Sequence, residues 1–198
     1  MHPLTVEIRD YAQNRIDIYF ADALSELLQQ RIENNRIDKI FRIFLPNFNA
    51  FMVHSSAVIR KDRVVFFLAH DEGGKTSVAR QAPAATVIGD DQVILRKQNG
   101  MYVGHSTPWG RIVNDPISAP LGAFFIIEKS PVFDLIPLKP KQVIEFLWSE
   151  QMDLIRGAPK QLRSKIFDRI CEAVHQVPLY QMQTPLNGVD WDRIDACL

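Results

Sequence analysis

Runs of apolar residues with two different periods predict an alternation of strands and helices along the chain. Apolar residues recur at helical intervals of three and four over 21–32 and again from Ile37 to Leu45, up to Pro46. Extended segments and further helices follow. The predicted strands are 4–9, 16–20, 52–60, 63–69, 86–95, 101–105, 122–129, 132–138 and 177–183, and the later predicted helices are 75–81, 140–150 and 160–176.

One two-residue turn predicts how the first pair of central strands is joined. Lys61-Asp62 lies between the strands 52–60 and 63–69, which suits an antiparallel hairpin. Pairing about this turn places His54 opposite Ala69. A histidine distant in sequence would then lie beside the residues that follow the second strand. The same position also suits a structural histidine at a strand end, and the sequence leaves both interpretations open.

A second turn, Asn99-Gly100, is a strong hairpin dipeptide and joins 86–95 to the next strand. Antiparallel pairing about it places Pro108 opposite Asp91. The segment 105–111 therefore returns beside the acidic end of the first strand, where it either holds a substrate or simply packs as a lid.

The sequence predicts that several apolar side chains are buried in the core and that one helix has a solvent-exposed face. Four phenylalanines fall in buried-strand patterns, and 160–169 carries the charges of an exposed helix face. The four are Phe66, Phe67, Phe124 and Phe125. No internal repeat, low-complexity tract or linker divides the chain. We therefore expect one α/β domain over 1–198, a mixed sheet with flanking helices, in three parts: 1–50, 51–138 and 139–198.

Composition narrows the functional classes. The 198 residues are 46% hydrophobic, and 23 Lys and Arg balance 23 Asp and Glu, so a general basic surface for nucleic acid is not expected. Cys171 and Cys197 lack metal-site or disulfide-scaffold spacing, which favours a reducing compartment. No apolar run is long enough to cross a bilayer, and no signal-peptide core is present. We expect a cytoplasmic protein without a membrane or nucleic-acid partner; a homo-oligomer remains open.

The strongest chemical signal is 69-AHDEGGKT-76, which fits the Walker A pattern with Ala69 in place of the first glycine. An apolar strand precedes it and a helix-compatible segment follows. Gly73 and Gly74 let backbone N–H groups approach phosphate oxygens, Lys75 supplies a positive charge to the β- and γ-phosphates, and the hydroxyl of Thr76 suits Mg²⁺. We expect residues 69–77 to bind nucleotide. The predicted set is Ala69, His70, Asp71, Glu72, Gly73, Gly74, Lys75, Thr76 and Ser77.

Asp71 and Glu72 are unusual residues for a loop that receives a triphosphate. Like charges about 4 Å apart repel by roughly 1–4 kcal/mol under watery to intermediate screening. Either these side chains point outward, or they act through the metal, or they reduce nucleotide affinity. The sequence does not choose among these three.

A second acidic signal follows the loop. The apolar pair Val87 and Ile88 leads into Gly89, Asp90 and Asp91, which is similar to a Walker B strand that ends in carboxylates. Successive strand residues face opposite ways, so the two acids are expected to have different roles. A solvated Asp-Asp turn is the alternative.

The order of these motifs resembles the C-terminal catalytic domain of HPr kinase/phosphorylase, a P-loop domain related in fold to the phosphoenolpyruvate carboxykinases. The clearest stretch runs from His54 to about Gly110. The segments 86–95, 107–110, 121–129 and 135–147 look more like the small HPr-kinase-related proteins of peptide-modification and exopolysaccharide-associated gene clusters. Two departures are Ala69 and Glu72, both at glycine positions of the kinase. We find no Glu-x-Arg-Gly element, so activity on HPr itself is not expected.

The resemblance implies roles for individual residues. Lys75 would contact the phosphates, Asp90 would be the base that activates a serine-type hydroxyl, and His54 and Asp91 would support the site. Thr76 and Asp91 would hold Mg²⁺. Three functions remain open: an ATP- and Mg²⁺-dependent phosphotransferase acting on a hydroxyl of a peptide, protein or small molecule, a weak or inactive nucleotide-binding regulatory module, and a scaffold that binds no nucleotide.

Overall fold

The computed structural model describes residues 5–10, 15–20, 42–83, 86–107, 116–155, 157–185 and 187–198. Strands β1 (Thr5–Asp10) and β2 (Arg15–Phe20) pair antiparallel, which confirms the two short strands expected near the start of the chain. The helix predicted over 21–32 lies outside the described residues, as does Ile37. The segment 105–111 is described only as far as 107.

The second helical pattern ends differently from the prediction. Residues 42–44 are helical, and a 3-10 turn, η1 (Leu45–Phe48), continues through Pro46 instead of stopping before it. Proline is tolerated there because it occupies the first or second position of the turn, where its missing N–H removes no helical hydrogen bond.

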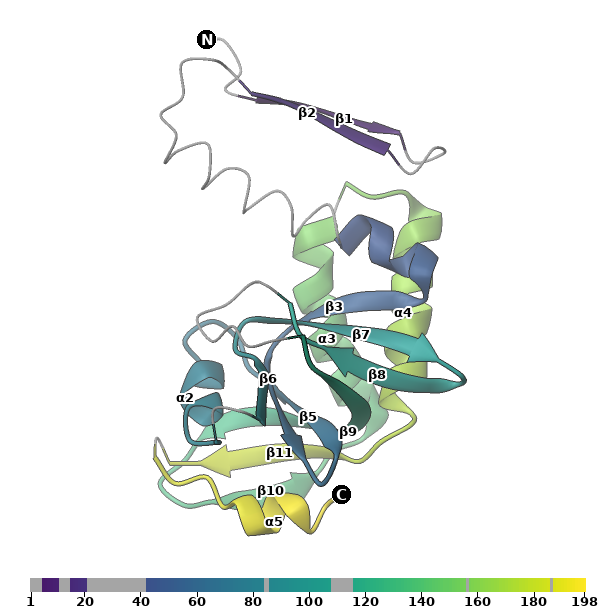
Figure 1. Cartoon of the computed structure of the whole chain (residues 1–198). Helices are drawn as coiled ribbons and strands as arrows, with labels where there is room; N and C mark the ends of the chain where they lie inside the picture. The colour runs from purple at the N-terminus through teal and green to yellow at the C-terminus, as the bar shows by residue number, and fades with distance from the viewer. Residues whose placement is uncertain are drawn as a thin grey trace.

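Among the described residues, nine strands form one large mixed sheet (Figure 1). Seven of them follow the spatial order β3-β7-β8-β9-β5-β4-β6, and β11 and β10 extend the sheet from β9. Their bounds are β3 Ala50–His54, β4 Ser56–Arg60, β5 Arg63–Leu68, β6 Val87–Gly89, β7 Gln92–Gln98, β8 Met101–His105, β9 Ser118–Lys129, β10 Asp134–Pro137 and β11 Leu179–Thr184. The expected mixed α/β architecture is therefore present.

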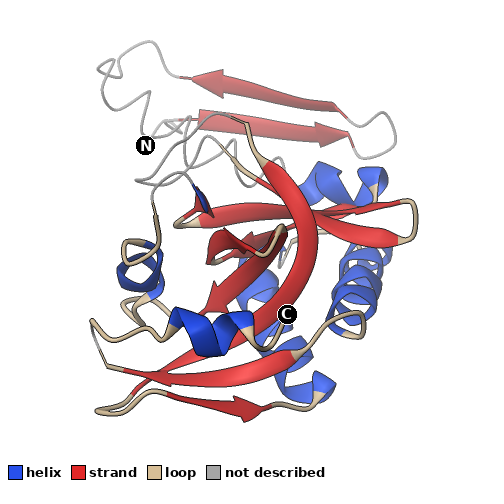
Figure 2. Cartoon of the chain, turned by 60° about the horizontal axis from the view of Figure 1, so that its bottom comes forward, coloured by secondary structure: helices blue, strands red, loops and turns tan. Residues whose placement is uncertain are grey.

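The long strand β9 makes the sheet curl. Its first residues pair antiparallel with β8, its middle pairs parallel with β5, and its last residues pair parallel with β11. Figure 2 shows β9 as a strongly curved ribbon linking the two parts of the sheet. Residues from both parts are thereby brought around a common core.

Helices cover both faces of the sheet. Phe66 and Phe124 pack in one cluster with apolar residues of α3 (Pro140–Ile155) and α4 (Lys160–Val174). Phe67 and Phe125, one residue further along each strand, pack in a second cluster with α2 (Lys75–Ala79) and α5 (Trp191–Asp195). Because successive strand residues face opposite ways, one phenylalanine pair serves each face. The four phenylalanines are fully buried, as predicted.

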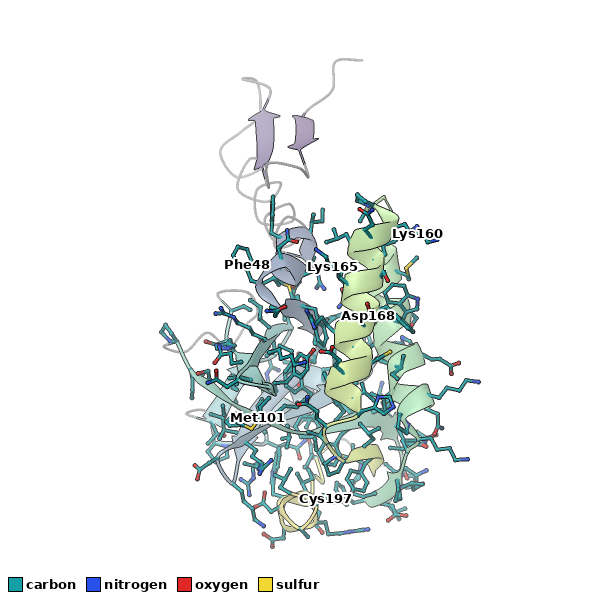
Figure 3. All side chains as sticks on the ribbon, turned by 90° about the vertical axis from the view of Figure 1, so that its right-hand side faces the viewer. Phe48, Met101, Lys160, Lys165, Asp168 and Cys197 are labelled. Atoms are coloured by element: carbon teal, nitrogen blue, oxygen red, sulfur yellow. The ribbon has the colours of Figure 1, made fainter. Side chains whose placement is uncertain are left out.

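The outer face of α4 is polar, as the sequence indicated. Lys160, Lys165 and Asp168 are exposed and project from the helix in Figure 3. Leu162 and Ile166, on the opposite side of the same helix, are buried in the core.

Two predicted strands are each broken in the middle. The segment 52–60 divides at Ser55 into β3 and β4, and 86–95 divides at Asp90-Asp91 into β6 and β7. The two bends meet, since the N–H of Ser55 donates to the carbonyl oxygen of Asp91 over 2.9 Å. Each half then pairs with a different neighbour, so one stretch of sequence contributes to two parts of the curled sheet.

The hairpin registers are confirmed over the paired residues. Arg60 lies opposite Arg63 across Lys61-Asp62, and Gln98 lies opposite Met101 across Asn99-Gly100. The extension of the first hairpin to His54 is wrong: pairing ends at Ser56, and His54 lies opposite Gln92 of β7 instead. Pro108 lies outside the described residues, so its predicted place opposite Asp91 is untested.

Helix α3 continues past Glu150 to Ile155, and α4 ends at Val174, slightly before the predicted limit. Within the described ranges, the longest helices are too short or too polar to traverse a bilayer. That residues 1–198 form a single domain stays a prediction.

Candidate functional site

The segment 69–75, which is the loop between β5 and α2 together with the first residue of α2, is tightly folded. The N–H of Gly73 donates to the carbonyl oxygen of His70 over 3.0 Å. A Cβ at Gly73 would lie 2.4 Å from the Cβ of Ala69, so only glycine fits opposite this alanine. Gly74 has φ of 100°, a left-handed conformation that suits glycine. These two positions explain locally why the sequence places glycines there.

Lys75 is buried at the start of α2 with its ammonium turned back onto the loop. Nζ donates to the carbonyl oxygens of Ala69 over 2.6 Å and His70 over 3.2 Å. Burial lowers the pKa of Lys75, and the negative charges of Asp71, Glu150 and Asp91 oppose that shift. An ammonium has three donors, so Lys75 is held by the loop and can still donate toward the pocket.

A pocket of about 480 Å³ lies against this loop. Its lining combines loop residues with three residues from the two strand bends: His54, Asp71, Glu72, Gly73, Gly74, Lys75, Thr76, Ser77, Asp90 and Asp91. Of the predicted nucleotide-binding residues, Ala69 and His70 do not line it. The structure therefore gathers the predicted glycines, lysine, hydroxyls and carboxylates around one cavity.

The two adjacent acids differ in their surroundings, although they lie in the bend between β6 and β7 and not within a strand as expected. Asp90 is 3% exposed, and its carbonyl oxygen accepts from the hydroxyl of Thr76 over 3.3 Å. The side chain of Asp91 is 46% exposed, and Oδ1 lies 3.2 Å from Nε2 of His54. The carboxylate of Asp91 is therefore the more accessible of the two from the pocket.

His54 lies between two carboxylates. Its Nε2 contacts Asp91, and its Nδ1 lies 3.2 Å from Oε2 of Glu150. A carboxylate only accepts hydrogen bonds, so both contacts together require both ring N–H groups, and hence the imidazolium form. The hydrogen bond to Asp91 accordingly raises the pKa of His54 against the opposing effect of burial, and the same bond lowers the pKa of Asp91.

The route by which His54 reaches the site differs from the prediction. Antiparallel pairing of β3 with β7 places it opposite Gln92, next to Asp91. The side chain of Arg42 donates to Gln92 over 3.0 Å, and its charge contributes to the lowered pKa of Asp91 after the His54 hydrogen bond. His54 therefore lies beside Asp91 through the β3–β7 pairing, and it is not part of the hairpin formed by β4 and β5.

Sequence reasoning missed Glu150, which α3 contributes from far along the chain. Its Oε1 lies 3.0 Å from Nδ1 of His70, whose ring also packs on Phe146 at a centroid distance of 4.8 Å. Phe146 and Glu150 are four residues apart, so they share a helix face. That spacing was visible in the sequence, but nothing local indicated which loop the face would meet.

The loop acids point outward. The side chain of Asp71 is 91% exposed and lies 3.9 Å from Nε2 of His54, and Glu72 is also exposed. Of the three options left open by the sequence, the structure favours acids that face solvent at the rim of the pocket. Glu72 has φ of 59°, an unusual value for a residue with a side chain.

The residues present fit a magnesium ion carried by a nucleotide. Mg²⁺ prefers oxygen ligands and often uses only one or two protein side chains together with substrate phosphates. Thr76 and Asp91 offer a hydroxyl and a carboxylate on the pocket wall. Over the residues that are described, no cluster of three or more His, Cys, Asp or Glu side chains is suited to hold a metal by itself.

Comparison with known proteins gives structural likenesses and a family. The structure of the Hpr(Ser) kinase/phosphatase from Coxiella burnetii is similar over 59% of this chain and 94% of that chain, at 11% identity and a TM-score of 0.33, which does not establish a common fold. No curated protein matches the chain. The family model described as SynChlorMet cassette protein ScmC matches residues 31–198, so this chain belongs to the ScmC family.

Proposed function

We propose that this protein binds ATP with Mg²⁺ in the pocket beside loop 69–75 and transfers the terminal phosphoryl group to a hydroxyl. The acceptor would be a hydroxyl of a peptide, a protein or a small molecule. The observation that carries the proposal is the meeting, around one cavity, of a glycine loop, a buried lysine, a threonine hydroxyl and two carboxylates. Phosphoryl transfer needs positioning and charge stabilisation from such groups, and little covalent chemistry from the protein.

Each group has a part in this proposal. Backbone N–H groups of the loop and the ammonium of Lys75 bind phosphate oxygens. Thr76 and Asp91 hold the metal, which when bound neutralises charge on the phosphates. Asp90 accepts the proton of the attacking hydroxyl, and the imidazolium of His54 keeps Asp91 ionised. The resemblance of the motif order to HPr kinase/phosphorylase supports these roles.

A second candidate function is a nucleotide-binding module without turnover. It is favoured by the acids on the loop: Asp71 and Glu72 add negative charge at the rim, next to where a triphosphate would lie. A module of this kind would keep Lys75 and the glycines but would not depend on Asp90.

Binding and turnover separate these functions. Calorimetry with ATP and Mg²⁺ tests binding. Transfer of the terminal phosphoryl group of ATP to water, or to added peptides that carry hydroxyl groups, tests turnover. We expect Asp90→Asn to keep nucleotide binding and to lower turnover by about 10²- to 10⁴-fold, the usual contribution of a general base. Binding with no turnover by the unmodified protein would favour the module.

The lysine variant tests the pocket itself. Lys75→Met should weaken nucleotide binding at least about tenfold, a change of about 1.4 kcal/mol. Lys139→Met, at an exposed lysine outside the pocket, is the matched control and should bind normally. If nucleotide at about 100 times any plausible dissociation constant fails to raise the stability of the unmodified protein by about 2.7 kcal/mol, the scaffold interpretation replaces both functions.

A further inference from the structure

One carboxylate joins three segments that are far apart in the sequence. Oε2 of Glu150 lies 3.2 Å from Nδ1 of His54 at the end of β3, and Oε1 lies 3.0 Å from Nδ1 of His70 at the start of the loop. The side chain of Glu150 is only 22% exposed. Hydrogen bonds to an ionised acceptor are roughly twice as strong as neutral ones, and two such contacts on one carboxylate tie His54 and His70 to the same point of α3.

The helix that carries Glu150 is itself fixed against the sheet. The next residue, Gln151, is buried and its amide donates to the carbonyl oxygen of Met52 in β3. Val143 and Leu147 of the same helix are in the core. Since α3 cannot shift easily, its carboxylate acts as a fixed point.

The other end of the bridge is the loop. His70 is 74% exposed, and its described side-chain contacts are the Glu150 carboxylate and the ring of Phe146, both on α3. The carbonyl oxygen of His70 in turn accepts from Nζ of Lys75 and from the N–H of Gly73. Holding the His70 ring therefore holds the backbone that sets the direction of the Lys75 ammonium.

We propose that Glu150 is a positioning residue: it ties His70 and His54 to α3 and so fixes the glycine loop in the conformation that receives nucleotide. Glu150 does not itself line the pocket, and it acts through the two histidines. This inference deepens the proposed function, and its nucleotide part rests on that function.

Hydrogen exchange in the free, full-length protein tests the bridge without nucleotide. We expect Glu150→Ala to speed exchange of the amides at 70–76 about tenfold, with no change in the core strands β5 and β9. Glu150→Asp should resemble the alanine variant, because a side chain one methylene shorter cannot reach both rings. Glu150→Gln should partly restore protection, since it keeps the length. Glu145→Gln, on the same helix and paired with Lys141, is the control and should change nothing.

Nucleotide binding tests the consequence. Glu150→Ala and His70→Ala should each weaken Mg·ATP binding about three- to tenfold. The double variant should bind no more weakly than Glu150→Ala alone, because Glu150→Ala already removes the contact that His70→Ala removes. Unchanged loop exchange in Glu150→Ala, or faster exchange throughout the core, would overturn the positioning role. Fully additive effects on binding would overturn it as well. If the unmodified protein binds no nucleotide, the proposed function fails, and the exchange measurements still decide the bridge.

Discussion

The hydroxyl of Ser56 donates to the carbonyl oxygen of Lys75 over 2.7 Å, a buried contact between β4 and the first residue of α2. Its neighbour Ser55 is equally buried, yet within the described part of the chain its Oγ has no hydrogen-bond partner. The side chains of these two adjacent serines therefore differ: the hydroxyl of Ser56 binds the helix that carries the pocket lysine, and the hydroxyl of Ser55 does not.

Replacing these serines should have opposite consequences. Ser56→Ala should lower the free energy of unfolding by about 0.5–1.5 kcal/mol, because the carbonyl oxygen of Lys75 loses one of its donors. Nucleotide binding should weaken together with stability, since Lys75 loses part of its support. Ser55→Ala should be neutral or stabilising. Urea denaturation of both variants checks this, and equal losses would contradict the assigned hydrogen bond.

Glu72 can be tested for strain and for charge separately. It occupies the left-handed region with φ of 59°, where a side chain costs about 1–2 kcal/mol and glycine costs little. Glu72→Gly should therefore change stability favourably by up to about 1 kcal/mol, after the entropy that glycine adds to the unfolded chain. Glu72→Gln keeps the strain and removes the charge. Both variants should bind Mg·ATP more tightly than the parent protein in calorimetry at low salt.

If the loop acids are instead part of the metal site, the glutamine variant would bind more weakly. That result would show that the outward orientation changes when nucleotide enters the pocket.

Binding of nucleotide should depend on a divalent cation. Four pocket residues are acids, against the two cations Lys75 and the His54 imidazolium, so a triphosphate without a metal cation meets net repulsion. With a chelator present, we expect ATP affinity to fall at least about tenfold. Thr76→Val should reproduce most of this loss, and Thr76→Ser, which keeps the hydroxyl, should not. Calorimetry with and without Mg²⁺ measures each affinity, and identical values for Thr76→Val and Thr76→Ser would exclude a hydroxyl ligand.

The His54–Asp91 pair predicts a pH dependence of stability in metal-free buffer. The pKa of His54 is raised from 6.5, so its contribution is complete below that value and is lost as the pH rises through the folded-state pKa. The pKa of Asp91 is lowered from 3.8, so its contribution is present above that value and is lost as the pH falls through the folded-state pKa. The pair should therefore stabilise the folded protein most between about pH 3.8 and pH 6.5.

The measurement compares the unmodified protein with His54→Gln. Because Asp91 is nearly half exposed, solvent screening limits the difference in unfolding free energy to about 0.5–1 kcal/mol near pH 6. This difference should shrink as the pH rises toward about 9. Asp91→Asn should remove most of the same dependence, and the smaller part that comes from the hydrogen bond of His54 to Glu150 should stay. A constant difference across this range would show that the two side chains are not paired in solution.

Much of this protein is determined by local sequence. Apolar runs bounded by Lys61-Asp62 and Asn99-Gly100 were enough to predict two hairpins and their registers, since a two-residue turn and a side-chain period of two leave one pairing. The apolar strand patterns around Phe66, Phe67, Phe124 and Phe125 were enough to predict that these side chains are buried. The loop 69–75 could be recognised in the sequence because its glycines are required locally. Gly74 has a left-handed backbone conformation, and Gly73 lies too close to Ala69 for a side chain.

Only the tertiary structure decided where His54 and Glu150 lie. The break at Ser55 carries no glycine or proline turn signal that distinguishes a bend from a continuous strand, so the division of 52–60 could not be predicted. The break at Asp90-Asp91 follows Gly89, so a turn there was one of the two interpretations that the sequence left open. The β3–β7 pairing and the contact of α3 with His70 join residues distant along the chain. Such contacts depend on how whole helices and strands bury their apolar faces against one another. Many residues of the core determine that packing together, so no local sequence pattern predicts it.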